Sequence, residues 1–188
     1  LQAAGIDPPQ KHMCNSGGSD WFRASFCNAV RIGRRLYMDN QAEPLTPGTP
    51  GAVQEACSWR ASVTNLRVVE AGDTVGYDAA WTAPRRTRVA TVCVGYGDGL
   101  YYPLAEAGGP LLVGEQRARL LATCMDQCFV DVTDIPCRAG DEVTFFGQSS
   151  GGAAMPIQEL GKFMHVEGVY FYSFLSPRVA RVYEGLEP

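Results

Sequence analysis

From residue 53 onward the chain is a series of short strand-like runs separated by turns, and this restricts it to a β-rich fold. In the run 128–132, Cys128, Val130 and Val132 share one face by the two-residue period of a strand. Segments rich in Gly, Asp, Pro and Ser separate the runs and favour turns. The pattern predicts one helix, at 156–164, and strands at 57–69, 88–94, 118–123, 128–132, 142–146 and 178–183.

The first 40 residues show a different pattern. A turn that closes in Asn-Ser-Gly-Gly, a short helix over 20–28 and a strand-like run over 29–38 follow one another, as in a βα unit. Residues 41–52 contain three prolines and two glycines, which predicts a linker or a long surface loop. We therefore expect two domains, residues 1–48 and residues 49–188.

Composition excludes several classes of partner. The 188 residues are 46% hydrophobic and 19% charged, which suits a globular protein with a real core. The net charge of −4 at pH 7 argues against general attraction to nucleic acid or to anionic membranes. No apolar run approaches the roughly 20 residues that span a bilayer. We expect no nucleic-acid partner and no direct membrane contact from this segment.

The seven cysteines indicate free thiols and not a disulfide framework or a metal centre. Their number is odd, no CxxC pair occurs, and the chain has only two histidines, so no zinc-ligand spacing can be assembled. We therefore expect no metal, and a reducing, cytoplasmic compartment.

Two glycine-bearing segments are candidate functional motifs. The run 88–99 ends in Gly-Tyr-Gly-Asp-Gly, and a phenol on such a turn could reach a neighbouring cavity or could simply cap a barrel edge. In Asn15-Ser16-Gly17-Gly18, backbone N–H groups and the serine hydroxyl could hold a phosphate, although the same letters also form ordinary loops. Gly33, between two arginines, would permit close approach by a ligand.

In their order, these motifs resemble the C-terminal half of alanine racemase, a pyridoxal-phosphate enzyme. The resemblance implies a mainly β fold, namely the β-rich C-terminal domain of alanine racemase type over residues 49–188. It also implies that residues 1–48 are the last βα elements of a (β/α)8 barrel. The matching segments span nearly the whole chain: HMCNSGG, VRIGRRLYM, AGDTVGYDAAWTAPRRTRVATVCVGYGDG, CMDQCFVDVTD, AGDEVTFFG and LSPRVARVY.

The resemblance assigns cofactor contacts to the first segment. Ser16 resembles the serine that hydrogen-bonds the cofactor phosphate, and Gly33 and Arg34 resemble the backbone donors to the same phosphate. Arg31 resembles the arginine that faces the pyridine nitrogen. Because an arginine does not give up its proton, the ring nitrogen would stay unprotonated and the ring would be a weaker electron sink. That favours simple return of a proton over transamination.

The resemblance also assigns the groups that act on the substrate. Tyr96 resembles the tyrosine that one subunit donates to the other subunit's site, where it is one of two bases; a homodimer is therefore implied. A free phenol has a pKa of about 10, so nearby cations must lower it for action near neutrality. Met125 resembles the methionine whose backbone N–H helps to hold the substrate carboxylate.

The implied function is interconversion of L- and D-alanine for bacterial cell-wall precursors. The lysine that binds pyridoxal 5'-phosphate belongs to the family's N-terminal half, and the only lysines here are Lys11 and Lys162, outside that segment. We therefore expect the fragment alone to be inactive and not to retain the cofactor.

Two alternatives stay open. One is a serine racemase of the vancomycin-resistance type, with a membrane segment upstream, and the other is a non-catalytic β module that serves only for association. Pro177 stands where some members place a pocket tyrosine, and Ala122 and Thr123 stand where an arginine is frequent. These departures leave the choice of alanine or serine, and the tuning of Tyr96, open.

Overall fold

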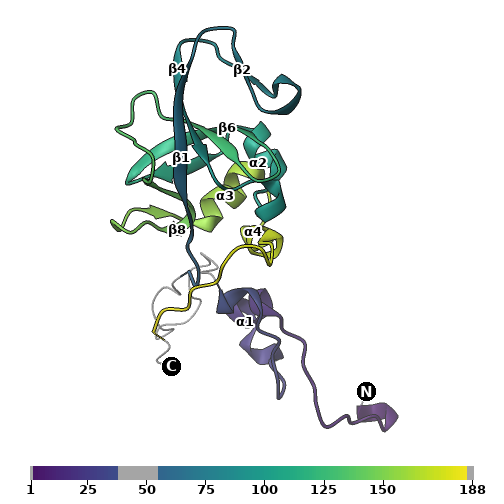
Figure 1. Ribbon diagram of the computed structural model, residues 1–188. Coiled ribbons are helices and arrows are strands. Elements are labelled where there is room, and N and C mark those ends of the chain that lie inside the picture. The colour runs from purple at the N-terminus through teal and green to yellow at the C-terminus, as the bar shows by residue number, and fades with distance from the viewer. Residues whose placement is uncertain (1, 38–54, 186–188) are drawn as a thin grey trace. The chain divides into compact units, whose positions relative to one another are not determined.

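The computed structural model of the chain describes residues 2–37 and 55–185 (Figure 1). The chain divides into two compact units, Leu1–Ala56 and Cys57–Pro188, and each is described by itself. The predicted boundary between residues 48 and 49 lies outside the described residues. Within the described ranges, no helix combines the length and apolarity needed to cross a membrane.

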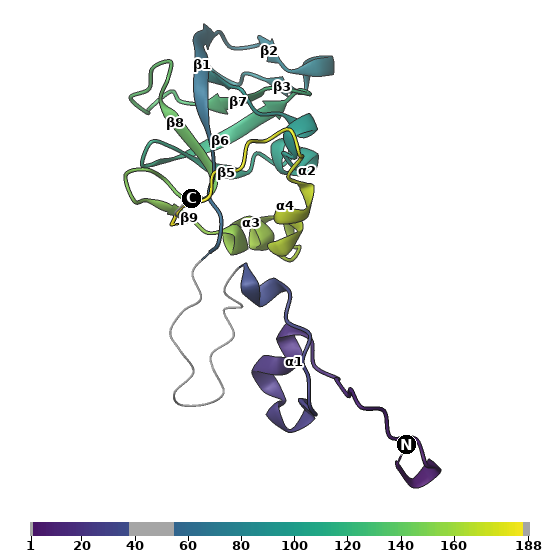
Figure 2. The ribbon, with the colours of Figure 1, turned by 60° about the horizontal axis from the view of Figure 1, so that its bottom comes forward.

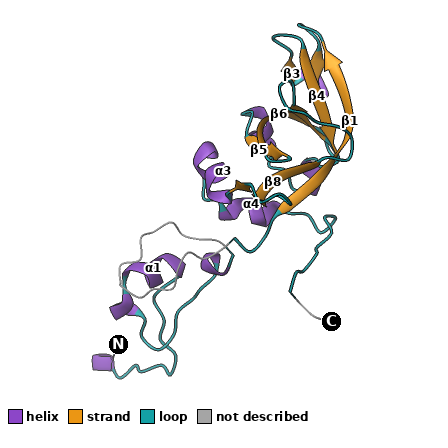
Figure 3. Ribbon diagram, turned by 90° about the vertical axis from the view of Figure 1, so that its left-hand side faces the viewer, coloured by secondary structure: helices purple, strands orange, loops and turns teal. Residues whose placement is uncertain are grey.

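The second unit is built on an antiparallel sheet that closes on itself. β1 pairs through its first half with β8, where Trp59 lies opposite Phe146, and through its second half with β4, where Val69 lies opposite Thr87. Figure 3 shows these strands in orange, with β4 beside β1. In sheet order the strands are β1 (Trp59–Val69), β4 (Thr87–Val92), β7 (Cys128–Asp131), β6 (Gln116–Thr123), β5 (Pro110–Val113), β8 (Glu142–Gln148) and β9 (Ala154–Met155).

The core follows from the apolar residues of these strands. Val63, Val89, Val130 and Val143 come from four different strands and are almost completely buried. β-branched side chains of this kind pack well on a pleated, enclosed surface. The mainly β prediction is therefore confirmed, and so are the strands expected near 57–69, 88–94, 118–123, 128–132 and 142–146.

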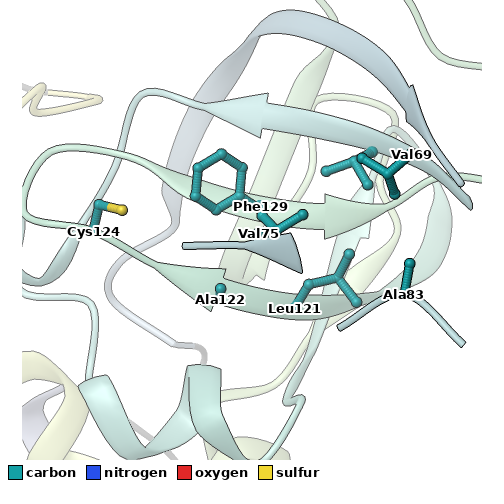
Figure 4. Packing of buried hydrophobic residues seen from close by; sticks show 8 residues of the cluster. Val69, Val75, Ala83, Leu121, Ala122, Cys124 and Phe129 are labelled. Atoms are coloured by element: carbon teal, nitrogen blue, oxygen red, sulfur yellow. The ribbon is translucent and has the colours of Figure 1, made fainter. Parts of the chain in front are cut away.

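A small hairpin stands on this sheet. β2 (Thr74–Val75) and β3 (Trp81–Thr82) pair antiparallel and carry the 3-10 turn η4 (Tyr77–Ala79) between them. Gly76, at φ +86°, lies so close to β6 that a Cβ atom on it would be 2.9 Å from the Ala122 Cβ. Figure 4 shows the hairpin cluster, which contains Val69, Val75, Ala83, Val89, Leu121, Ala122, Cys124 and Phe129. This cluster anchors the hairpin to the barrel.

Among the described residues of the second unit, three α-helices accompany the barrel. The predicted helix is confirmed as α3 (Ile157–Met164), which buries Ile157 and Leu160. α2 (Tyr102–Glu106) and α4 (Val169–Phe174) were not predicted, because short aromatic segments lack a helical period long enough to detect. Figure 2 shows α3 and α4 side by side.

The strand predicted at 178–183 is wrong. This segment is not paired to any strand, and Val182 and Tyr183 are 84% and 72% exposed. The Arg181 guanidinium donates to the carbonyls of Leu175, Ser176 and Val179. The Arg181 side chain thus provides hydrogen bonds to nearby backbone carbonyls, whereas the carbonyls of a strand accept from a neighbouring strand.

The first unit holds only short elements among its described residues. They are η1 (Gln2–Ala4), α1 (Ser16–Trp21), η2 (Arg23–Ser25) and η3 (Arg34–Leu36). The helix predicted over 20–28 is wrong in position: it begins at Ser16, because the Asn15 side chain caps it by accepting from the Gly18 N–H at 2.9 Å.

The strand predicted over 29–38 is also wrong for its described residues, 29–37. They form a single parallel bridge, between His12 and Ala29, and then turn at Gly33 into η3. An extended segment forms only an isolated bridge when no neighbouring segment pairs with it over several residues.

We predict that Leu121→Ala destabilises the second unit by about 2–5 kcal/mol, because it empties a buried position beneath the hairpin. Urea unfolding followed by tryptophan fluorescence would measure the loss. Val68→Ala is the matched control on β1, since Val68 is 46% exposed and should shift stability by less than about 0.5 kcal/mol. Equal losses in the two variants would contradict the packing described here.

Candidate functional site

The Tyr96 turn follows directly after β4. Tyr96 opens the 3-10 turn η5 (Tyr96–Asp98), and the Gly95 N–H donates to Asp98 Oδ2 at 3.0 Å. Gly99, at φ +111°, ends the turn in the left-handed region. The side-chain bond from Asp98 closes the turn on itself, which fixes the backbone on both sides of the phenol.

The Tyr96 turn docks on the loop that joins β6 to β7. The Tyr96 N–H donates to the Cys124 carbonyl at 3.0 Å, and the Gly97 N–H donates to the Met125 carbonyl at 2.8 Å. A Cβ atom on Gly95 would lie 2.3 Å from the Cys124 carbonyl oxygen, and one on Gly97 would lie 2.9 Å from the Met125 carbonyl oxygen. The glycines on both sides of Tyr96 therefore permit the docking, and the structure brings Tyr96 and Met125 together.

Large side chains are exposed around this docked pair. Tyr96 is 38% exposed and Met125 is 52% exposed. The Tyr102 ring meets the Tyr96 ring edge to face, with 6.0 Å between the centroids. A group of exposed aromatic and thioether side chains is typical of a surface that binds a ligand or another chain.

A second phenol, that of Tyr77, belongs to the same neighbourhood and was missed in the sequence. It lies on the hairpin turn η4 and is 59% exposed. The Cys124 thiol, a partial loss of hydration, and the Tyr96 and Asp126 side chains together raise the pKa of Tyr77 above its ordinary value. A signal for it was present, because Val-Gly-Tyr occurs at 75–77 and again at 94–96.

The Tyr77 turn is conformationally strained. Asp78 and Ala79 adopt φ angles of +52° and +55°, which non-glycine residues rarely do. Each such residue costs about 1–3 kcal/mol, and strain of this kind concentrates at functional sites. The turn is held in this conformation by the hairpin cluster below it.

The candidate cofactor residues of the first unit also lie together. The Gly33 N–H donates to the Ser16 hydroxyl oxygen at 3.1 Å, and Arg34 follows at the start of η3. The Arg31 N–H donates to the Cys14 carbonyl at 2.9 Å, so the segments 12–16 and 29–33 are tied by backbone bonds.

Arg31 is oriented by a histidine. Its Nη1 lies 2.8 Å from His12 Nδ1, and because a guanidinium can only donate, the imidazole nitrogen must accept. His12 therefore restricts where the remaining guanidinium N–H groups point. No motif in the sequence predicts this role for His12.

The geometry around Ser16 suits a phosphate group. Ser16 is 6% exposed, and its hydroxyl proton can be donated outward while its oxygen accepts from Gly33. A Cβ atom on Gly33 would meet no heavy atom within 4 Å, so space is open beside its backbone. A hydroxyl beside backbone N–H groups is a common way to hold a phosphate oxygen. The residues present thus fit the phosphate end of pyridoxal phosphate.

Comparison with known proteins gives one consistent result. The family model "Alanine racemase, C-terminal domain" matches residues 56–183. The alanine racemase of Desulforamulus reducens is 33% identical over 187 residues, which are 98% of this chain and 49% of the relative. The biosynthetic alanine racemase of Pseudomonas aeruginosa is 34% identical over 95% of this chain and 48% of the relative. The chain thus spans about half the length of these curated relatives.

Solved structures agree with this result. The crystal structure of the biosynthetic alanine racemase from Pseudomonas aeruginosa gives a TM-score of 0.80 at 33% identity, over 98% of this chain and 50% of that one. The alanine racemase from the D-cycloserine producer Streptomyces lavendulae gives 0.83 at 29% identity, over 99% and 48%. A histidine racemase from Leuconostoc mesenteroides gives 0.75 at 29% identity, over 94% and 47%.

We predict that Gly95→Ala separates the Tyr96 turn from the Met125 loop. The Gly95 backbone, at φ −133°, accepts alanine without strain, so the cost arises only from the 2.3 Å approach to the Cys124 carbonyl oxygen. We expect a loss of more than about 2 kcal/mol in unfolding free energy.

Gly114→Ala is the matched control. Gly114 lies at φ +56° with nothing within 4 Å of the added carbon, so it measures backbone strain alone, about 1–2 kcal/mol. Amide hydrogen exchange at residues 96 and 97 should rise in Gly95→Ala and stay as in the unsubstituted chain in Gly114→Ala. Unchanged exchange in Gly95→Ala would contradict the docking.

Proposed function

Because this chain belongs to the alanine racemase family, we propose that it is the C-terminal part of a pyridoxal-phosphate-dependent racemase that interconverts L- and D-alanine. The observation that carries the proposal is the docking of the Tyr96 turn on the Met125 loop, which sets phenols beside backbone amides on one exposed surface. The complete enzyme would be a homodimer in the cytoplasm that supplies D-alanine for the cell wall.

The first unit would hold the cofactor through its phosphate and its ring. Ser16 and the backbone N–H groups of Gly33 and Arg34 would donate to the phosphate, and the Gly33 N–H would turn to it from the Ser16 hydroxyl to which it donates in this structure. Arg31, oriented by His12, would face the ring nitrogen. When bound, pyridoxal phosphate withdraws electrons from the substrate α-carbon and makes its proton labile. Because neither Lys11 nor Lys162 is the family's cofactor lysine, the isolated chain would be inactive.

The second unit would supply one of two bases and a substrate contact. In one direction of the reaction the phenol must take the α-proton at its oxygen while the other base supplies a proton on the opposite face of the α-carbon. In the reverse direction the phenol gives a proton to its own face. The Met125 N–H would help to hold the substrate carboxylate, at the loop whose Cys124 and Met125 carbonyls accept from the Tyr96 turn. In the dimer these groups would enter the partner subunit's site.

Two phenols are candidates for the base. Tyr96 is the one that the sequence resemblance assigns. Tyr77 is favoured by its greater exposure, by the strained turn that carries it and by its electrostatic interaction with Tyr96 and Asp126. Since its neighbours raise the pKa of Tyr77, it would need a cation from outside this cluster to act near neutral pH.

Serine is a second candidate substrate. Pro177 is smaller than the pocket tyrosine that some family members carry at this place, which favours a substrate with a larger side chain than that of alanine. The parent would then be a racemase of the vancomycin-resistance type. A competition assay of alanine against serine with the complete protein decides between the two.

We expect Phe substitution to identify the base in the full-length protein, which contains the upstream barrel. Loss of a proton-transfer group lowers kcat/KM by about 10²- to 10⁴-fold. The loss is equal from the two enantiomers, because the equilibrium constant of a racemisation is one. Racemisation should be followed from both enantiomers for Tyr77→Phe and Tyr96→Phe, and the larger loss marks the base.

Tyr102→Phe is the matched control, because the Tyr102 ring packs on Tyr96 but its hydroxyl has no assigned role. It should retain activity within about threefold of the unsubstituted enzyme. If all three variants racemise both enantiomers at the unsubstituted rate, a phenol base is rejected. If the full-length protein racemises neither alanine nor serine, the association-module alternative gains support.

A further inference from the structure

A buried carboxylate, that of Asp98, ties the Tyr96 turn to the C-terminal segment 175–181. The residue is 9% exposed. One carboxylate oxygen, Oδ2, accepts from the Gly95 N–H at 3.0 Å, and the other, Oδ1, lies 3.5 Å from Arg178 Nε. The Asp98 carbonyl also accepts from the Ser176 N–H, at 3.0 Å. A buried carboxylate needs such partners to offset its lost hydration.

Arg178 lies against the turn at Gly97, next to the contact that Gly97 makes with the Met125 loop. Its Nη1 would lie 3.1 Å from a Cβ atom on Gly97, so the guanidinium rests on the backbone next to Tyr96. The Gly97 N–H, in turn, donates to Met125. The turn is thus bonded to the Met125 loop and is also paired, through Asp98, with Arg178.

We propose that Asp98 and Arg178 form a positioning pair that sets the orientation of the Tyr96 phenol relative to the Met125 loop. Neither side chain takes or gives the substrate proton. The carboxylate holds the Gly95 N–H at the start of the turn, and the guanidinium holds the carboxylate. The catalytic consequence of this pair rests on the function proposed above, whereas its effect on the turn does not.

Because Asp98 and Arg178 are buried to different extents, an effect on the Tyr96 turn can be distinguished from an effect on the unfolding free energy. The Asp98 side chain is 13% exposed and that of Arg178 is 58% exposed, so solvent weakens the attraction. A pair with one partner in solvent adds less to the unfolding free energy than a fully buried pair. Breaking the pair should therefore loosen the turn and slow turnover more than it lowers the melting temperature, which a purely structural pair would not do.

Asn and Gln substitutions test the charge without removing the shape. Asp98→Asn keeps an oxygen for the Gly95 N–H and removes the carboxylate charge, and Arg178→Gln removes the partner. In the full-length protein, amide exchange at residues 95–97 should rise several-fold in each single variant. The double variant should match either single one, because both break the same interaction.

Activity provides the second measurement. We expect kcat for alanine to fall by about 10- to 100-fold in either variant, as displaced catalytic groups do, with a smaller change in KM. Arg178→Lys should restore part of both readouts, since the charge remains. Arg85→Gln is the matched control, because Arg85 pairs with Asp134 at 3.7 Å on the open surface, and it should match the unsubstituted protein.

The outcomes distinguish the two proposals. Unchanged exchange at residues 95–97 in both single variants, or additive effects in the double variant, would overturn the positioning pair even if racemisation is observed. Faster exchange in a protein that racemises no amino acid would support the pair's hold on the turn and overturn the proposed function. If Asp98→Asn does not fold, Arg178→Gln alone decides, because its side chain is largely exposed.

Discussion

Two backbone hydrogen bonds, from Tyr96 to the Cys124 carbonyl and from Gly97 to the Met125 carbonyl, hold the candidate site together. These bonds are possible because the sheet places the Tyr96 turn next to the Met125 loop. β4 and β7 are neighbours, with Val92 opposite Cys128, so the turn that follows β4 emerges beside the loop that precedes β7. The glycines on each side of Tyr96 then allow a closer approach than any side chain would permit.

The two halves of the candidate machinery are organised by different physical means. In the second unit, a closed sheet with a buried, valine-rich interior supports the Tyr96 and Tyr77 turns. In the first unit, the candidate phosphate residues are held by local polar bonds: a capped six-residue helix and the contact between Ser16 and Gly33. The first kind of order comes from burial of apolar surface, and the second from hydrogen bonding of loops.

Much of the β unit could be predicted from the sequence, because its strands carry their own two-residue period and are separated by turn residues. The strand prediction at 178–183 was wrong although the segment has strand-like residues, because Arg181 donates to the nearby carbonyls of Leu175, Ser176 and Val179 and no neighbouring strand pairs with the segment. Residues 29–37 have a composition typical of strands, but strand formation also depends on a neighbouring strand with which to pair.

The site was predicted in part. Ser16 and Gly33 stood out as parts of glycine-bearing segments, and the family resemblance assigned site roles to them and to Arg31, Tyr96 and Met125. Ser16, Arg31 and Gly33 lie together, as do Tyr96 and Met125, while their roles stay predictions. Tyr77 was overlooked although it shares its tripeptide with Tyr96, because its approach to Tyr96 and Asp126 depends on how the hairpin sits on β6. Asp98 and Arg178 are far apart in sequence, and only the tertiary structure pairs them.

The double pairing of β1 has a consequence for the order in which the chain matures. β1 is the first strand of the barrel to leave the ribosome, yet Trp59 must wait for Phe146 before the ring of strands can shut. β4, β6 and β7 are all translated before β8, so every strand that positions Tyr96 and Met125 exists while the barrel is still open. Contacts between distant segments form slowly, and the pairing of β1 with β8 that closes the barrel becomes possible only after these strands have been translated.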